Sequence, residues 1–289
     1  MEQLEGRVAV VTGGGSGIGR AVATQLAAAG MSVVVADIQQ DALDATVAGL
    51  ARAGHRVLGV RTDVSDGDSV TALADAAVTE FGAVHLVHNN AGVGVGGPIW
   101  AHTERDWQWV LGVNLWGVIH GIRVFVPLML EQGGPAHVVN TASMAGLISV
   151  PSLGAYNVSK HGVVTLSETL YRDLRLAGAD IGVSVLCPGL VMTNIFESQR
   201  NRPEPLADDD GGSGGLSALM EGVGEPGATE AAADAFGQIL SPDEVGAAVV
   251  DAVRGNRFYI LTHPERTEAL VRTRCDDIVD ARHPSPLRP

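Results

Sequence analysis

The sequence is short of positive charge and of long apolar runs. Among its 289 residues, 19 Lys and Arg stand against 33 Asp and Glu, which gives a formal net charge of −14. A field of this sign repels phosphate backbones and anionic lipids, so neither nucleic acid nor a membrane is expected as a partner. No uninterrupted apolar run reaches the roughly 18 residues of a membrane-spanning helix, and the acidic segment Met1–Glu5 lacks the features of a signal peptide. The prediction is a soluble cytoplasmic protein.

Cysteine is scarce as well. The two cysteines, Cys187 and Cys275, lie far apart and match no metal-ligand spacing. The histidines show no H-x-x-x-H or H-E-x-x-H pattern. We therefore expect reduced cysteines, no disulfide and no metal site.

Glycine, by contrast, is abundant. The 37 glycines do not follow the G-X-Y period of collagen. Hydrophobic residues make up 46% of the chain and charged residues 18%, which excludes intrinsic disorder as the main state. The length corresponds to roughly two average domains or to one large domain.

Short apolar runs alternate with helix-length amphipathic segments. Residues 18–29 place Ile18, Val22 and Leu26 on one helical face, and residues 69–81 repeat the pattern. Such alternation, with near-continuous apolar strands, predicts a parallel sheet covered by helices on both faces. Because the pattern is unbroken, we predict one α/β domain over residues 1–289, a Rossmann-like doubly wound sheet. Its seven predicted strands are Val8–Val11, Ser32–Ala36, Arg56–Val60, His85–His88, His137–Asn140, Gly182–Leu186 and Arg257–Leu261.

A longer helix is predicted from Thr103 to Pro127. The segment 103–106 resembles a capping box, and an apolar face follows it. Three of the four tryptophans, Trp107, Trp109 and Trp116, fall in this helix. We expect them to pack against the sheet or another subunit; stacking on a substrate is the alternative.

Two segments depart from the strand and helix pattern. Residues 200–237 are rich in Gly and Ala, and the pattern resumes at residues 241–244 with a capped helix start. We interpret residues 200–237 as an insertion that forms a lid over the active site; a disordered surface loop is the alternative. Residues 262–289 form a C-terminal tail, predicted to lie at the surface or between subunits.

A glycine-rich turn joins the first predicted strand to the first helix. Its spacing is Gly13-x-x-x-Gly17-x-Gly19, not the strict G-x-G-x-x-G fingerprint. Backbone N–H groups and the positive end of the helix dipole at such a turn bind a pyrophosphate. A tight turn without a ligand is the alternative.

Acidic residues end the next two predicted strands. At Asp37, a carboxylate can accept hydrogen bonds from an adenosine ribose and repel a 2′-phosphate. None of the three residues after Asp37 (Ile38-Gln39-Gln40) is basic, and residue 16 is serine, so the sequence favours NAD over NADP. Asp63 and Val64 are candidates for contact with adenine; a helix-capping role for Asp63 is the alternative.

Tyr156 and Lys160 are spaced to lie on one helical face. The lysine cation is expected to favour the phenolate and so to lower the pKa of Tyr156 toward the range of a general base. Ser143 at the end of the preceding strand, together with the glycine loop, makes this pair a strong indication of a catalytic site.

In order and spacing, these motifs resemble the short-chain dehydrogenase/reductase family, from T-G-x-x-x-G-I-G through N-N-A-G and Y-x-x-x-K to P-G. The resemblance implies that Tyr156 is the general base, that Lys160 lowers its pKa and binds the nicotinamide ribose, and that Ser143 holds the substrate oxygen. It adds Asn114 as the anchor of a water that relays protons to Lys160. With the loop and the aspartates, the predicted cofactor-binding residues are Gly13, Gly15, Ser16, Gly17, Ile18, Gly19, Asp37, Ile38, Asp63, Val64, Asn90, Ala91, Gly92, Tyr156, Lys160, Pro188, Gly189, Val191 and Thr193.

Residues 185–191 and 256–265 carry a looser resemblance to the branch that contains the lignin-type aryl alcohol Cα-dehydrogenases. Those enzymes act on bulky benzylic alcohols. The residues that follow the motifs in the chain are mostly aliphatic and predict an apolar substrate pocket. Its candidates are Val93, Gly94, Val95, Ser143, Met144, Leu147, Leu153, Leu190 and Phe196.

The predicted function is the interconversion of a secondary alcohol and a ketone by hydride transfer with NAD. An NADP-dependent carbonyl reductase is one alternative, and a non-catalytic dinucleotide-binding sensor is another. The apolar faces of residues 107–122 and 158–174 predict a homo-oligomer, with a tetramer favoured over a dimer. The expected partner is a small-molecule alcohol or ketone.

Overall fold

The computed structural model describes residues 1–207 and 238–287. Most of the predicted insertion, residues 208–237, lies outside the described residues. The interpretation of that segment as a lid therefore stays a prediction.

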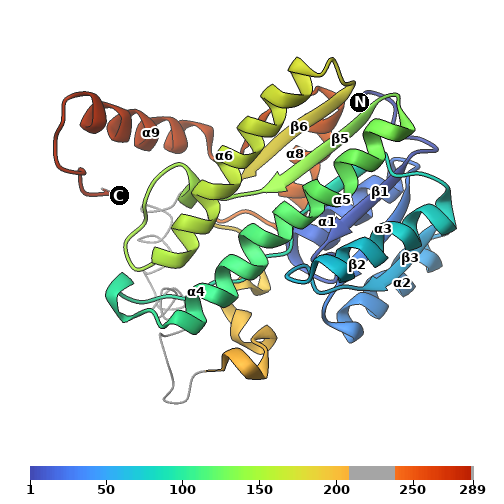
Figure 1. The fold of residues 1–289 in the computed structure, drawn as a ribbon, viewed down its shortest axis with the longest axis horizontal. Helices are drawn as coiled ribbons and strands as arrows, with labels where there is room; N and C mark the ends of the chain where they lie inside the picture. Colours follow the sequence, from blue (N-terminus) through green and yellow to red (C-terminus); the bar gives the residue numbers. More distant parts are fainter. Residues whose placement is uncertain (208–237, 288–289) are drawn as a thin grey trace.

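Seven parallel strands form one sheet in the order β3-β2-β1-β4-β5-β6-β7 (Figure 1). Every predicted apolar run lies on one of these strands, which confirms the predicted fold class. The last strand is shorter than predicted, because pairing with β6 begins only at Tyr259. The strands are β1 (Val8–Thr12), β2 (Ser32–Asp37), β3 (Val57–Arg61), β4 (Leu86–Asn89), β5 (Ala136–Thr141), β6 (Ile181–Cys187) and β7 (Tyr259–Leu261).

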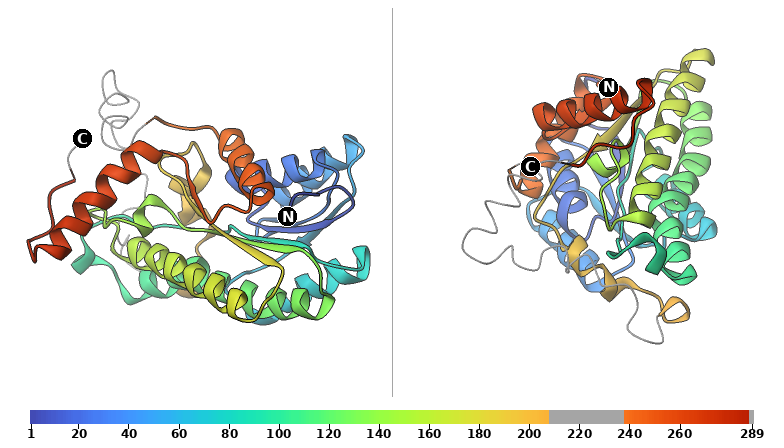
Figure 2. Two further views of the ribbon diagram at one scale, coloured as in Figure 1. Left: turned by 90° about the horizontal axis from the view of Figure 1, so that it is seen from above. Right: turned by 90° about the vertical axis from the view of Figure 1, so that its left-hand side faces the viewer.

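Helices cover both faces of the sheet, which lies between two helical layers in Figure 2. One layer contains α1 (Gly17–Ala28), α2 (Gln40–Arg52) and α8 (Pro242–Arg254). The opposite layer contains α3 (Gly67–Phe81), α5 (Gly117–Gln132) and α6 (Gly154–Leu176).

The central strands are largely apolar because both of their faces are buried. On β1, Ala9 and Val11 pack in the core beneath α1 and α8, whereas Val10 packs in the core beneath α3 and α5. Side chains alternate between the faces of a strand, so a strand covered on both sides carries apolar residues at consecutive positions.

The helix predicted from Thr103 consists of α4 (Glu104–Leu111), a π-helical turn (Gly112–Trp116) and α5. Thr103 and Asp106 form the predicted capping box. The predicted end at Pro127 is wrong: the proline lies inside α5, which continues to Gln132. A proline removes one helical N–H, and burial of Phe125 and Met129 around it holds the helix together beyond that point.

By length and composition alone, the helical run Glu104–Gln132 is long and apolar enough to cross a membrane, with a hydropathy of 1.5. In the fold, however, α5 lies on the sheet and contributes Phe125 and Met129 to the core. Its apolar character thus has an explanation within the globular fold.

The C-terminal tail contains a helix that the sequence analysis missed. Helix α9 (Pro264–Val279) extends away from the body of the sheet (Figure 2). Asp277, near the end of α9, accepts hydrogen bonds from the backbone N–H and the hydroxyl of Ser285, at 2.8 and 3.0 Å, which fixes the chain that follows the helix. Few apolar residues of α9 are buried, so it shows little of the periodicity from which helices are predicted.

Two buried histidines make the folded state sensitive to acid. Burial lowers the pKa of His88 on β4 and of His137 on β5 from 6.5 to about 3. As the pH falls from 6.5 toward 3, the unfolded chain binds protons at both groups that the folded chain does not bind, so stability decreases. We expect the free energy of unfolding, measured by denaturant titration at stepwise lower pH, to fall by up to about 2.7 kcal/mol per pH unit from these groups.

His137→Gln tests this pH dependence, and His283→Gln is its matched control. Replacing His137 should remove about half of the histidine contribution to this slope. Replacing His283, which is exposed, should leave the slope unchanged. An unchanged slope in His137→Gln would show that this histidine is not held neutral by burial.

Candidate active site

A cavity of about 600 Å³ lies at the carboxyl ends of the strands. It is lined by the segments that follow β1, β2, β3, β4, β5 and β6, on both sides of the point where the strand order reverses between β1 and β4. Open parallel sheets bind ligands at this position.

The glycine loop brings backbone close to backbone at one wall of the cavity. Gly13 has a φ of +63°, and a β-carbon there would lie 2.9 Å from the Cα of Ala91. The side chain of Ser16, the residue before α1, makes no capping hydrogen bond, so it does not satisfy the N–H groups of the first helical turn. This cradle fits the pyrophosphate of a dinucleotide.

Not all of the predicted loop residues face the cavity. Gly13, Ser16, Gly17 and Ile18 line it, as do the Asn-Ala-Gly segment 90–92 and the predicted residues after β6, which are Pro188, Gly189, Val191 and Thr193. Gly15 and Gly19 do not line the cavity. Gly15 donates its N–H to Asp37, and a β-carbon on Gly19 would overlap the carbonyl group of Gly13.

The carboxylate of Asp37 is held in place at one end of the cavity. One oxygen, Oδ2, accepts from the N–H of Gly15 at 2.9 Å, and Oδ1 accepts from the N–H of Gln39 at 3.0 Å. Because both oxygens are fixed by backbone, the carboxylate can accept ribose hydroxyls without reorganising and would repel a 2′-phosphate.

Ile38, Asp63 and Val64 line the same end of the cavity. Asp63 Oδ1 accepts from the backbone N–H and the hydroxyl of Ser65, at 2.9 and 2.6 Å. The alternative interpretation of Asp63 as a helix cap is wrong, because Asp66 is the residue that caps α3.

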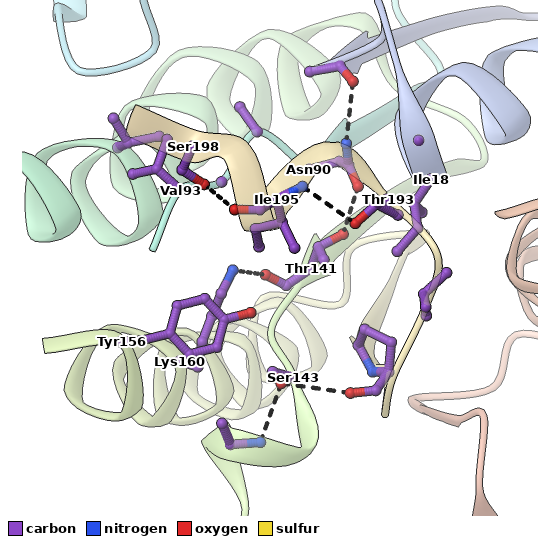
Figure 3. Close-up of a pocket in the computed structure, with 18 of the residues that line it drawn as sticks. Ile18, Asn90, Val93, Thr141, Ser143, Tyr156, Lys160, Thr193, Ile195 and Ser198 are labelled. Carbon is purple, nitrogen blue, oxygen red and sulfur yellow. Dashed lines mark hydrogen bonds between the residues drawn. The ribbon is translucent and has the colours of Figure 1, made fainter. Parts of the chain in front are cut away.

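Ser143, Tyr156 and Lys160 meet at the cavity from two elements (Figure 3). Ser143 follows β5, and the other two lie on α6. The amine of Lys160 lies 5.5 Å from the centroid of the Tyr156 ring and donates to the carbonyl oxygen of Thr141 at 2.9 Å. Lys160 is also the only lysine in the sequence, a signal that the sequence analysis overlooked.

The pKa shifts at this pair differ from the sequence expectation. Burial raises the pKa of Tyr156 to about 12, although interaction with the Ser143 hydroxyl opposes the shift. Burial also lowers the pKa of Lys160 to about 8. The expectation that Lys160 lowers the pKa of Tyr156 is therefore not met in this structure, because desolvation dominates and the amine bonds to a carbonyl oxygen.

A polar network missed by the sequence analysis supports the site. Thr141 Oγ1 donates to Asn90 Oδ1 at 3.3 Å and lies 2.8 Å from the Nε2 atom of His88. Asn90 in turn donates from Nδ2 to the carbonyl oxygen of Thr12 at 3.0 Å. The network joins the ends of β1, β4 and β5, so only the register of the sheet brings its members together.

Asn114 lies in the π-helical turn, behind the cavity wall. Its Oδ1 accepts from the N–H of Val93 at 2.8 Å, and its Nδ2 donates to the Val93 carbonyl at 2.9 Å and to Ser159 Oγ at 3.1 Å. π-Helical turns occur often at functional sites. The water-anchoring role implied by the family resemblance stays a prediction.

Six of the nine residues predicted for the substrate pocket line the cavity, and their contact with a substrate stays a prediction. Val93, Met144, Leu153, Leu190 and Phe196 line the cavity with Ser143. Gly94, Val95 and Leu147 do not: Gly94 bonds to Ser198, and the other two pack in hydrophobic clusters. The lining residues that the sequence analysis missed include Ile148, Val150, Ile195, Leu270 and Leu287. Trp109, for which stacking on a substrate was the alternative interpretation, also lines the cavity.

The chain belongs to the short-chain dehydrogenase/reductase family, since the family model for short chain dehydrogenases matches residues 7–204. A short chain dehydrogenase/reductase of Burkholderia phymatum, solved in complex with NAD, is 49% identical, covers 99% of both chains and superposes with a TM-score of 0.91. A C alpha-dehydrogenase of Sphingobium is 34% identical over 93% of this chain and 85% of the relative, which bears out the looser resemblance. A 1-deoxy-11-beta-hydroxypentalenate dehydrogenase of Streptomyces exfoliatus is 36% identical over 98% of this chain and 93% of the relative.

Proposed function

We propose that the protein is an NAD-dependent dehydrogenase that interconverts a secondary alcohol and a ketone. The observation that carries this proposal is that Ser143, Tyr156 and Lys160 line the same cavity as Asp37. Groups that handle a hydroxyl, together with a carboxylate that suits a ribose, fit hydride transfer between an alcohol and a dinucleotide. The likeness to a protein solved with NAD supports the choice of cofactor.

Each of the three residues has a proposed task. Tyr156 takes the proton of the substrate hydroxyl, and Ser143 hydrogen-bonds the same oxygen to fix it beside the phenol. Lys160 holds the nicotinamide ribose through its amine. When bound, NAD would supply the acceptor for the hydride of the carbinol carbon and, in its oxidised form, a positive charge near Tyr156.

The proposed substrate is an apolar or aromatic alcohol or ketone. The end of the cavity beyond Ser143 is formed largely by aliphatic and aromatic side chains, among them Met144, Leu153 and Trp109. A relative described as a C alpha-dehydrogenase and one described as a pentalenate dehydrogenase are consistent with a bulky substrate.

The test is oxidation of a panel of aryl, cyclic and aliphatic secondary alcohols with NAD and, separately, with NADP. We expect formation of NADH with at least one apolar alcohol and a higher kcat/KM with NAD than with NADP. A preference for NADP in the reducing direction would instead establish a carbonyl reductase. Binding of NAD without turnover of any alcohol or ketone would favour the alternative of a non-catalytic dinucleotide-binding sensor.

Asp37→Ala should weaken NAD binding and leave NADP binding unchanged or tighter. The carboxylate would accept hydrogen bonds from the adenosine ribose, and loss of such charge-assisted bonds corresponds to roughly 10- to 100-fold in affinity. Calorimetric titration of both cofactors measures the effect. Asp41→Ala is the control, because Asp41 is exposed on α2 nearby and carries the same charge. Equal affinities for NAD in the wild type and Asp37→Ala would contradict the assignment.

The proposal includes a cytoplasmic homo-oligomer, with a tetramer favoured. It is supported by apolar side chains that the single chain leaves exposed, Trp116 beside α5 and Val158 on α6, with 49% and 47% of their surfaces accessible. Light scattering on the purified protein decides between a monomer, a dimer and a tetramer.

A further inference from the structure

A buried ion pair joins α4 to the segment that follows β6. Arg202 Nη1 donates to Asp106 Oδ1 at 2.7 Å, and the two side chains are 5% and 0% exposed. The other carboxylate oxygen of Asp106 accepts from the N–H of Thr103 at 2.8 Å as part of the capping box. The ion pair thus connects residues 96 positions apart and is anchored at a helix terminus.

Further contacts hold the same segment against α4 and its surroundings. Arg202 Nε donates to the carbonyl oxygen of Leu206 at 2.6 Å, and Arg105 donates to the carbonyl oxygen of Ala207 at 2.6 Å. Ser198 accepts from the N–H of Gly94 at 3.2 Å. The segment 194–207 is therefore fixed at several points along one wall of the cavity.

Trp109 contacts both this ion pair and the cavity. The guanidinium carbon of Arg202 is 5.2 Å from the centroid of its ring. The side chain packs with Val93, Val95 and Ala155, has 3% of its surface exposed, and lines the cavity. A planar guanidinium next to an indole restricts the orientation of the ring.

Building on the proposed function, we infer that Trp109 determines substrate specificity by forming the far wall of the substrate pocket, and that Asp106 and Arg202 are positioning residues that fix its ring. The substrate class that fits is an alcohol whose apolar or aromatic body lies against the indole. The wall sets the size of that body, because contact with a buried guanidinium and close packing restrict the movement of the indole. Asp106 and Arg202 act through Trp109 and need not touch the substrate.

The first test uses secondary alcohols of graded size with Trp109→Leu. We expect the ratio of kcat/KM for a bulky alcohol to that for a small one to change by at least about 10-fold, the scale on which apolar pockets discriminate by size. The affinity for NAD should stay within about 2-fold of the wild type, since Asp37 and the glycine loop are untouched. Trp107→Leu is the matched control: Trp107 lies two positions earlier on α4 and does not line the cavity. An unchanged ratio in an active Trp109→Leu would overturn the inference.

The second test separates positioning from simple stability. Arg202→Met should shift the size ratio in the same direction as Trp109→Leu, and the double variant should show no further shift, because both changes act on one ring. Arg202→Lys keeps the charge but not the planar guanidinium and should give an intermediate ratio. If Arg202→Met fails to fold, the size ratio of Arg202→Lys alone tests the positioning role. Additive shifts in the double variant, or a wild-type ratio in both Arg202 variants, would overturn the positioning role.

A binding measurement keeps this inference distinct from the proposed function. If no alcohol or ketone is turned over, the proposed function fails. The place of Trp109 in the pocket is then decided by titrating an aryl ketone into the protein with NADH and following tryptophan fluorescence. We expect the change in emission to be retained in Trp107→Phe and lost in Trp109→Phe. Retention in both variants would overturn the inference.

Discussion

Tyr156→Phe is expected to reduce kcat by about 10²- to 10⁴-fold, the usual contribution of a positioned general base. The substitution removes only the hydroxyl and keeps the ring that fills this side of the cavity. NAD affinity should remain near the wild-type value, because the glycine loop and Asp37 lie at the other end of the site. Steady-state kinetics and calorimetric titration of NAD together measure the two effects.

The pKa of Tyr156 adds a pH dependence to this prediction. Burial raises the pKa to about 12, so the phenolate is scarce at neutral pH. Below the pKa, the phenolate fraction increases about tenfold per pH unit, so kcat for oxidation should rise with pH until another step becomes limiting. Tyr171→Phe, on the same helix and exposed, is the control and should keep wild-type kinetics. Retention of most of the activity by Tyr156→Phe would refute the assignment of the base.

Gly19→Ala is expected to abolish measurable NAD binding, a loss of at least about 100-fold in affinity. A β-carbon at this position would overlap the carbonyl group of Gly13 and lie 2.6 Å from the side-chain amide of Asn90. The carbonyl belongs to the loop itself, so relief of the overlap requires the loop to open. The same crowding should lower stability by roughly 1–3 kcal/mol. Calorimetric titration and thermal unfolding measure the two quantities.

Gly49→Ala is the matched control for Gly19→Ala. Gly49 also lies in a helix, α2, but nothing lies within 4 Å of the added β-carbon. Alanine is favoured over glycine in a helix interior by roughly 1 kcal/mol, so this variant should be more stable and should bind NAD normally. If Gly19→Ala bound NAD as tightly as Gly49→Ala, the close packing of the loop would not be required for the cofactor.

The sequence was sufficient to predict the strands, because a parallel strand covered on both faces is apolar at consecutive positions. Residues 8–11 and 32–36 are examples, and every residue in both ranges is buried. The class of fold followed from the alternation of such strands with amphipathic helices. Helix α9 was missed for the opposite reason, since most of its side chains are exposed and leave no apolar periodicity to detect.

The site was predictable only where its residues share one stretch of chain. Tyr156 and Lys160 are one helical turn apart, so their spacing indicates a shared face. Thr141 lies on β5, His88 lies on the neighbouring β4 and Asn90 directly follows β4, so they meet through sheet register, which a single sequence does not reveal. Spacing also gave no sign of the burial that raises the pKa of Tyr156, because burial depends on the whole fold.

The tryptophans also show that a single sequence does not reveal contacts between distant parts of the chain. Trp107, Trp109 and Trp116 lie on one helical run, yet only Trp109 of the three lines the cavity described. Trp116 is half exposed beside α5, whereas Trp109 is enclosed by Arg202 from a segment that follows β6. The contact that distinguishes Trp109 therefore comes from a distant part of the chain.

The most direct test of the proposed reaction uses a secondary alcohol from the panel that carries deuterium at its carbinol carbon. The alcohol is incubated with NAD and the purified protein, and the reduced cofactor is then isolated and weighed by mass spectrometry. If the proposed reaction is correct, deuterium appears in the reduced cofactor, the ketone forms in equal amount, and both products are lost in Tyr156→Phe. Binding of NAD with no transfer of deuterium from any alcohol in the panel would contradict it.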